Sequence, residues 1–300
     1  MIRPALSSVA FPEWTLDRVA EFAKRANYDA VELRTFGFGS TDLACDPLLS
    51  DPIKTAQCFQ EAGVGILSLA TSLSFDKPVF PPIVGLALGD YDGPVRQCRR
   101  IIEVARAMDC PFVRVFGFEL QAAESRRGGI KRVAKRLQRA VDACRNTGVR
   151  VVIENGGSFC RAAELAELIE KADMNNLLGA CYSVPVGVAA GDDVGEAARL
   201  LGDKLLMAKV SERNEAGRTV ALGKGTPDSR AAIAALASAG FEGCVIVDHN
   251  RLWDRGAPLP IAELEAAPEF VFKAGLSESH RSAGGARSNG RADAFVAAGR

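Results

Sequence analysis

The sequence has 300 residues, of which 48% are hydrophobic and 25% are charged, as expected for a globular protein with a large core. Lysine plus arginine and aspartate plus glutamate each number 37, so no overall charge favours binding to nucleic acid or to an anionic membrane. No apolar run approaches the roughly 18 residues of a membrane span, and the N-terminus shows no signal-peptide pattern. We therefore expect a cytoplasmic protein whose partner is a small-molecule substrate. A homo-oligomer is compatible with the sequence.

The eight cysteines are scattered and form neither a C-x-x-C pair nor a zinc-binding spacing. Most lie within apolar helix or strand patterns, which is typical of small buried residues in a reducing compartment. A nucleophilic cysteine usually needs a basic partner. Since the chain has only two histidines, His249 and His280, we expect no catalytic cysteine.

Strand and helix patterns alternate from the N-terminus onward. Predicted strands cover residues 4–11, 29–34, 65–71, 111–117, 150–154, 178–183, 205–211 and 244–249. Predicted helices follow them, at 15–25, 52–63, 93–108, 130–148, 161–172, 193–202, 227–239 and 260–273. This alternation predicts an α/β protein with a (β/α)₈ TIM barrel fold. An open doubly wound sheet is the rival, but it would be expected to show a glycine-rich phosphate loop after the first strand, and residues 7–11 contain none.

Two segments fall outside the alternation. Residues 72–92 form a long loop rich in proline and glycine, and loops of this length commonly act as lids or binding surfaces. Residues from 277 onward are small, polar and basic without periodicity. We therefore predict one barrel domain over residues 1–276 and a disordered, flexible C-terminal tail over 277–300.

The most informative stretch is 150–157, Arg-Val-Val-Ile-Glu-Asn-Gly-Gly. Three consecutive β-branched residues predict a strand that is buried on both faces, as in a parallel sheet covered by helices. Glu154 ends that strand just before a Gly-Gly turn, and in TIM barrels this rim is where the chemistry takes place. The structural alternative is that Glu154 only hydrogen-bonds the turn.

Polar residues at the other strand ends are expected to converge on the same mouth. They are Glu32, Thr71, Arg114, Ser183, Lys209 with Ser211, and Asp248 with His249. Lys209 and Arg114 lie within apolar strands, so each is expected either to contact a substrate or to form a structural ion pair. Glu32 is expected to brace Arg34 or a neighbouring strand. His249 is an alternative base, although a residue next to Asp248 on a strand points the other way.

Several sequence segments at the predicted strands, taken in chain order, resemble those of the xylose isomerase-like TIM barrels. The resemblance covers residues 3 to 275 and is carried by segments 28–33, 113–116, 152–155, 179–182, 208–209 and 222–225. This superfamily contains sugar isomerases and epimerases, dehydratases and apurinic endonucleases. An endonuclease role would need several histidine ligands and a basic face, which this chain does not offer.

The resemblance also implies a divalent metal bound by Glu, Asp, His and Glu on the fifth to eighth strands. These four positions carry Glu154, Ser183, Met207 and Asp248 in this chain. Because a thioether and a neutral hydroxyl are poor ligands for a hard cation, we expect no metal cofactor. Weak or substrate-assisted metal binding through Glu154 and Asp248 is the alternative.

Without a metal, Glu154 and Asp248 are expected either to share a proton or to be compensated by Lys209. We predict an isomerase or epimerase, or a dehydratase, that removes a proton next to a carbonyl in a small sugar, polyol or keto compound. Glu154, Asp248 and Lys209 are the predicted catalytic residues. Arg114, Ser183, His249 and Glu32 are the predicted substrate-binding residues. The alternative is a non-catalytic barrel that retained a sugar-sized pocket, which the loss of two metal ligands would fit.

Overall fold

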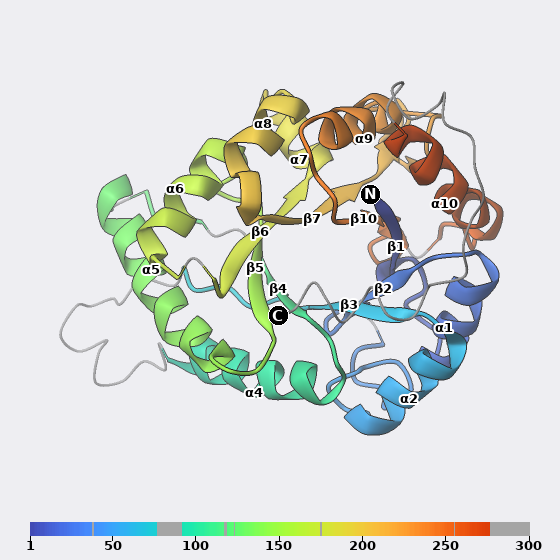
Figure 1. Ribbon diagram of the computed structural model, residues 1–300, viewed down its shortest axis with the longest axis horizontal. Helices are drawn as coiled ribbons and strands as arrows, with labels where there is room; N and C mark the ends of the chain where they lie inside the picture. Colours follow the sequence, from blue (N-terminus) through green and yellow to red (C-terminus); the bar gives the residue numbers. More distant parts are fainter. Residues whose placement is uncertain are drawn as a thin grey trace.

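The computed structural model describes residues 1–37, 39–76, 92–116, 119–122, 124–174, 176–254 and 256–276. Eight parallel strands close into a barrel in the order β1-β10-β7-β6-β5-β4-β3-β2, and the helices form a ring around it (Figure 1). The barrel strands are β1 Arg3–Ser7, β2 Ala30–Arg34, β3 Gly65–Ala70, β4 Phe112–Val115, β5 Arg150–Glu154, β6 Leu178–Ser183, β7 Leu205–Val210 and β10 Cys244–Val247. This architecture confirms the predicted (β/α)₈ TIM barrel.

The surrounding helices follow the predicted order. They are α1 Leu16–Arg25, α2 Pro52–Ala62, α4 Gly93–Ala107, α5 Arg126–Val141, α6 Ala162–Ala172, α7 Val184–Ala189, α8 Val194–Leu201, α9 Ser229–Ser238 and α10 Ile261–Gly275. Helix α2 shows the local interactions that fix where a helix begins and where it ends. The Asp51 side chain accepts hydrogen bonds from the backbone N–H groups of Ile53 and Lys54, and Pro52 occupies the first turn. Gly63 ends the helix in the left-handed conformation, with φ at 70°.

The structure differs from three local predictions and adds two features that were not predicted. The first strand ends at Ser7, because Ser8–Ala10 forms a 3₁₀ turn, η1. Thr15 precedes α1 but makes no side-chain capping bond. Helix α5 ends at Val141 and is followed by a 3₁₀ turn rather than continuing to residue 148. Helix α7 and the small hairpin of β8 Glu212–Arg213 and β9 Thr219–Val220 were not predicted.

Two further predictions concern segments that the structure does not describe. Most of the 72–92 loop, at 77–91, and the whole 277–300 tail lie outside the described residues. Their assignment as a lid or binding surface and as a disordered tail therefore stays a prediction. Among the described residues, no helix has both the length and the apolar character that a membrane crossing requires.

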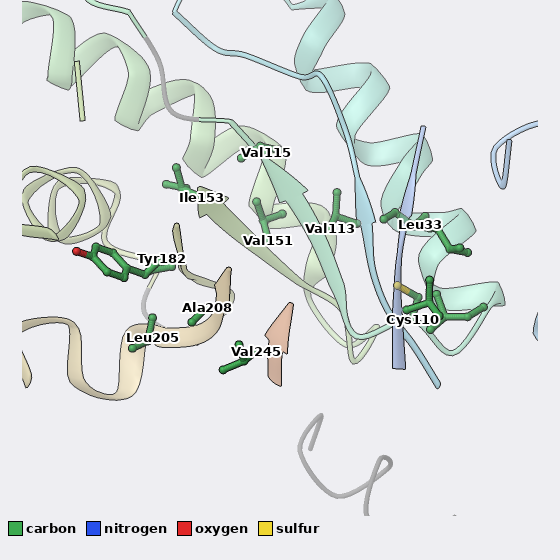
Figure 2. Packing of buried hydrophobic residues seen from close by; sticks show 14 of the residues in the cluster. Leu33, Cys110, Val113, Val115, Val151, Ile153, Tyr182, Leu205, Ala208 and Val245 are labelled. Atoms are coloured by element: carbon green, nitrogen blue, oxygen red, sulfur yellow. The ribbon is translucent and has the colours of Figure 1, made fainter. Parts of the chain in front are cut away.

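Alternation along the strands divides the buried side chains into two sets. One set lies between the strands and the helices, and Figure 2 shows part of it, including Val113, Val151 and Ile153. The other set fills the barrel interior: Ala5, Ala30, Leu67, Phe112, Val152, Cys181, Met207, Cys244 and Ile246. Because side chains on one face recur every two residues, the next inward positions lie one layer closer to the carboxyl ends of the strands. That layer holds Ser7, Glu32, Arg114, Glu154, Ser183, Lys209 and Asp248.

Candidate active site at the carboxyl ends of the strands

Five charged side chains from five strands meet at this end of the barrel. Lys209 Nζ lies 3.0 Å from Glu32 Oε1, 3.4 Å from Glu154 Oε2 and 3.7 Å from Asp248 Oδ2. Arg114 lies on the other side of the two glutamates, with its Nη1 3.0 Å from Glu154 Oε2 and its Nε 3.4 Å from Glu32 Oε2. Three carboxylates and two cations therefore form one network, which we call the charged cluster.

Burial within the charged cluster is graded. The side chains of Glu32 and Arg114 are 0% and 1% exposed, whereas those of Glu154 and Asp248 are 11% and 19% exposed. Glu32 and Arg114 thus seal the base of the cluster, and Glu154 and Asp248 reach the mouth. Of the two expected roles of Glu32, bracing Arg34 or a neighbouring strand, the structure shows the second, since Glu32 accepts hydrogen bonds from Ser7, Ser68 and Lys209. Its bracing of neighbouring strands is confirmed, since Ser7 lies on β1 and Ser68 on β3.

The cluster sets the protonation states of its buried members. Burial alone would lower the pKa of Lys209, but the charges of Glu154 and Glu32 outweigh burial and raise this pKa well above its usual range. Burial would likewise raise the pKa of Glu32, but Lys209 and Arg114 outweigh it and lower this pKa. The three carboxylates around Lys209 therefore favour its ammonium form, which is not a nucleophile.

Asn155 fixes the rim next to Glu154, and sequence reasoning missed it. Its amide nitrogen donates to the carbonyl oxygens of Cys160, at 2.9 Å, and Ser183, at 3.2 Å, and its oxygen accepts from the Ser183 backbone N–H. The side chain thereby ties the end of β5 to the end of β6. The signal in the sequence was the Glu-Asn pair just before the Gly-Gly turn, where an amide side chain can satisfy loop backbone groups.

Ser183 and His249 are not members of the charged cluster. Ser183 is paired in register with Lys209 and is the residue that precedes α7. His249 is buried, and its Nδ1 makes no hydrogen bond among the described residues. Burial lowers the pKa of His249, against the opposing charges of Glu263 and Asp248. The predicted substrate contact of His249 stays a prediction.

Three aromatic side chains lie above the charged cluster. Phe36 follows β2, Phe116 follows β4, and Trp253 follows β10. The guanidinium carbon of Arg114 lies 4.3 Å from the ring centroid of Phe116 and 5.7 Å from that of Phe36. Phe36 in turn lies 6.2 Å from the Trp253 ring. In the sequence, Phe36 and Phe116 stand two residues beyond Arg34 and Arg114, which continues the alternation of their strands, whereas Trp253 shows no such signal.

The cysteines are free and mostly buried. Cys181 lies in the barrel interior directly below the charged cluster, and burial together with the charge of Glu154 raises its pKa well above the usual range. A thiol in this state is a poor nucleophile.

The residues at the four implied metal positions do not fit a hard divalent cation. Met207 is fully buried and packs in the barrel interior, and Ser183 offers only a neutral hydroxyl. Both ion pairs of Glu154 use Oε2, which already faces Arg114 and Lys209. Among the described residues, no group of three or more His, Cys, Asp or Glu side chains is arranged to hold a metal ion.

Comparison with known proteins agrees with this architecture. A family model described as xylose isomerase-like TIM barrel matches residues 20–271. The chain belongs to the xylose isomerase-like TIM barrel family. No curated protein sequence matches it.

Solved structures of xylose isomerase-like barrels share the fold at low sequence identity. An L-ribulose 3-epimerase is 19% identical with a TM-score of 0.73, and the match covers 94% of this chain and 96% of that one. A probable 3-DHS dehydratase from Bacillus anthracis is 13% identical with a TM-score of 0.69, covering 88% and 98%. A fusion of a xylose isomerase-like TIM barrel with 4-hydroxyphenylpyruvate dioxygenase is 16% identical with a TM-score of 0.67. That match covers 83% of this chain but only 38% of the fusion protein.

Proposed function

We propose that the protein is an isomerase or epimerase, or a dehydratase of related chemistry, that acts on a small hydroxylated carbonyl compound without a divalent metal. The observation that carries the proposal is the position of Lys209, whose Nζ lies within 3.7 Å of Glu32, Glu154 and Asp248. A fixed cation beside two carboxylates that reach the mouth supplies a base and a stabiliser for an enolate oxygen. The epimerase and dehydratase named among the similar structures support this class of reaction.

In the proposed reaction, Asp248 is the base, because it is the most exposed and most loosely paired acid of the charged cluster. It removes the proton from the carbon next to the carbonyl, and the C–H electron pair moves into the enolate, whose oxygen accepts a hydrogen bond from Lys209. Glu154, once it has taken up a proton from solvent, gives that proton to the opposite face of the carbon and so inverts the centre, and Asp248 releases its proton to solvent. Departure of a β-hydroxyl group, which takes the proton from Asp248 and leaves as water, instead gives dehydration.

Exchange of the substrate α-proton in D₂O, followed by NMR over a panel of ketoses and cyclic ketones, tests the proposal. We expect exchange in the wild type with chelator present, and a rate lower by about 10²–10⁴ in Asp248→Asn. Glu154→Gln should keep the exchange at Asp248 but lose inversion of the centre. Asp254→Asn is the matched control, because Asp254 is an exposed acid on the same loop. Exchange that requires added Mn²⁺, or that survives unchanged in Asp248→Asn, would overturn the proposal.

One observation favours a second candidate, a non-catalytic ligand-binding barrel. Glu32 and Arg114 are sealed from solvent and paired within the charged cluster, so this part of the network can serve stability alone. Binding of a compound in the mouth without exchange of any proton, across the whole panel, would select this candidate.

A further inference from the structure

We infer that the amino-terminal end of the barrel holds a second ligand site, which takes a small organic anion with a flat apolar body and one carboxylate. The site is a cavity of about 330 Å³, lined by Arg3 at the start of β1 and by Arg150 at the start of β5. We call it the base cavity. The charged cluster lies at the carboxyl ends of the strands, so the two sites occupy opposite ends of the barrel. The inference therefore does not depend on the proposed function.

Two arginines enter the base cavity from opposite sides. In the closed ring of eight strands, β1 and β5 stand four places apart and so face each other across the barrel (Figure 1). Arg3 comes two residues before Ala5, which belongs to the barrel interior. Arg150 comes two residues before Val152, which belongs to the same interior set. Because every second side chain of a strand points to the same face, both arginines are directed toward the barrel axis.

The positive charges of the base cavity lie deeper than its negative charges. Arg3 and Arg150 are partly buried. The acids that line the cavity, Asp203 and Glu242, are exposed. The Glu242 side chain is 80% exposed and pairs with the N-terminal amine at 2.8 Å. Water and salt screen an exposed charge more strongly than a partly buried one, so an anion inside the cavity would meet net attraction.

Arg150 is the principal contact for such an anion. Burial lowers the pKa of Arg150, because its charge is partly removed from water. Arg3 shares its surroundings with Asp29, since the opposite charges of these two residues both act on the pKa of Cys244. A carboxylate beside Arg150 would therefore compensate a charge that water reaches poorly, whereas Arg3 already has an acid nearby.

Apolar side chains form the inner wall of the base cavity. Leu67, Phe112 and Cys244 line it and belong to the barrel interior. The guanidinium carbon of Arg150 lies 5.1 Å from the ring centroid of Phe112. A guanidinium group can stack on a ring and still donate two parallel hydrogen bonds to a carboxylate from its edge. An apolar wall with a few polar groups is typical of sites for small organic molecules, and an inorganic anion would leave that wall unused.

Calorimetric titration of the wild type tests both parts of the inference. The probes are benzoate, benzamide, which keeps the flat body without the charge, and inorganic phosphate, which keeps a charge without the body. We expect benzoate to bind at least about tenfold more tightly than either of the others. Added salt should weaken the binding of benzoate and leave that of benzamide unchanged.

Variants locate the bound benzoate. Arg150→Met keeps an unbranched side chain without the charge and should weaken binding at least about tenfold, and Arg3→Met should weaken it about threefold. Arg106→Met, at an exposed arginine of α4, is the matched control and should change nothing. Glu154→Gln, at the mouth, should also leave the affinity for benzoate unchanged.

Several results would overturn the inference. These are no binding of benzoate, binding of benzamide or phosphate that is equally tight, and unchanged affinity for benzoate in Arg150→Met. A change of affinity in Glu154→Gln would place benzoate at the mouth and would overturn it as well. If circular dichroism shows that Arg150→Met does not fold, Arg3→Met takes its place, and unchanged affinity in that variant counts against the site.

Discussion

Lys209 on β7 donates a hydrogen bond of 3.0 Å to Glu32 on β2, across the interior of the barrel and between strands that are not neighbours. Removing one partner of such a buried pair strongly destabilises the folded protein, because the charge of the other partner is left without compensation. Glu32 is entirely buried, so its carboxylate has no access to water.

Lys209→Met is therefore expected to destabilise the protein by about 3–5 kcal/mol, measured by urea unfolding. Adding Glu32→Gln should recover part of this loss, because the isolated buried charge disappears. The control is Lys273→Met, which breaks the exposed Lys273–Glu269 pair on α10 and should cost less than about 1 kcal/mol. If Lys209→Met and Lys273→Met lowered the free energy of unfolding equally, the hydrogen bond between Lys209 and Glu32 would stabilise the fold no more than an exposed ion pair.

The lowered pKa of Glu32 predicts how the free energy of unfolding depends on pH in the acidic range. A carboxyl whose pKa is lower in the folded than in the unfolded chain stabilises the fold above its unfolded pKa, about 4.3. This contribution is lost as the pH falls below that value toward the folded pKa. Unfolding free energies measured from pH 7 down to pH 3 should therefore fall more steeply in the wild type than in Glu32→Gln. Parallel curves would contradict this assignment.

Metal removal is expected to have no effect. Dialysis against a chelator should leave both the thermal midpoint and the α-proton exchange rate unchanged, because Met207 and Ser183 offer no anionic or imidazole ligand. Calorimetric titration of Mn²⁺ into the wild type and Glu154→Gln provides the second measurement. Micromolar binding to the wild type that is lost in Glu154→Gln would mean that other ligands complete a metal site.

A second buried carboxylate supports the loop beyond β7. Glu212 is fully buried and accepts hydrogen bonds from the backbone N–H groups of Lys224, Gly225 and Ser229, at 2.7 to 3.0 Å. It thereby ties the β8–β9 hairpin to the first turn of α9. Glu212→Gln should destabilise the protein by about 1–3 kcal/mol, since one amide –NH₂ would face these donors. Arg213→Gln, at the exposed neighbouring residue, should stay within about 0.5 kcal/mol by the same unfolding measurement.

Regular patterns made most of the fold predictable. Long β-branched runs such as 150–154 mark strands in any context, and helix ends such as Gly63 have a local cause. Helix α7 escaped prediction because it has only six residues and contains Pro185 and Gly187. The two-residue strands of the hairpin are too short to show any period, and they depend on Glu212, whose burial cannot be read from its neighbours in sequence.

The candidate site was predictable as a set of residues but not as a network. Alternation placed Glu154, Lys209 and Asp248 at one end of the barrel. Whether Lys209 would compensate the acids depended on which strands stand three places apart around the closed barrel, which is a property of the whole chain. The bonds from Ser7 and Ser68 to Glu32 were missed for the same reason.

The distribution of the charged cluster along the chain links its formation to completion of the fold. Glu32 and Arg114 come from the first four strands, and Glu154, Lys209 and Asp248 come from the last four. An isolated N-terminal half would bury Glu32 without Lys209, and an isolated C-terminal half would gather two acids around one cation. The charged cluster is therefore complete only when both halves of the barrel are in place and the first strand is paired with the last.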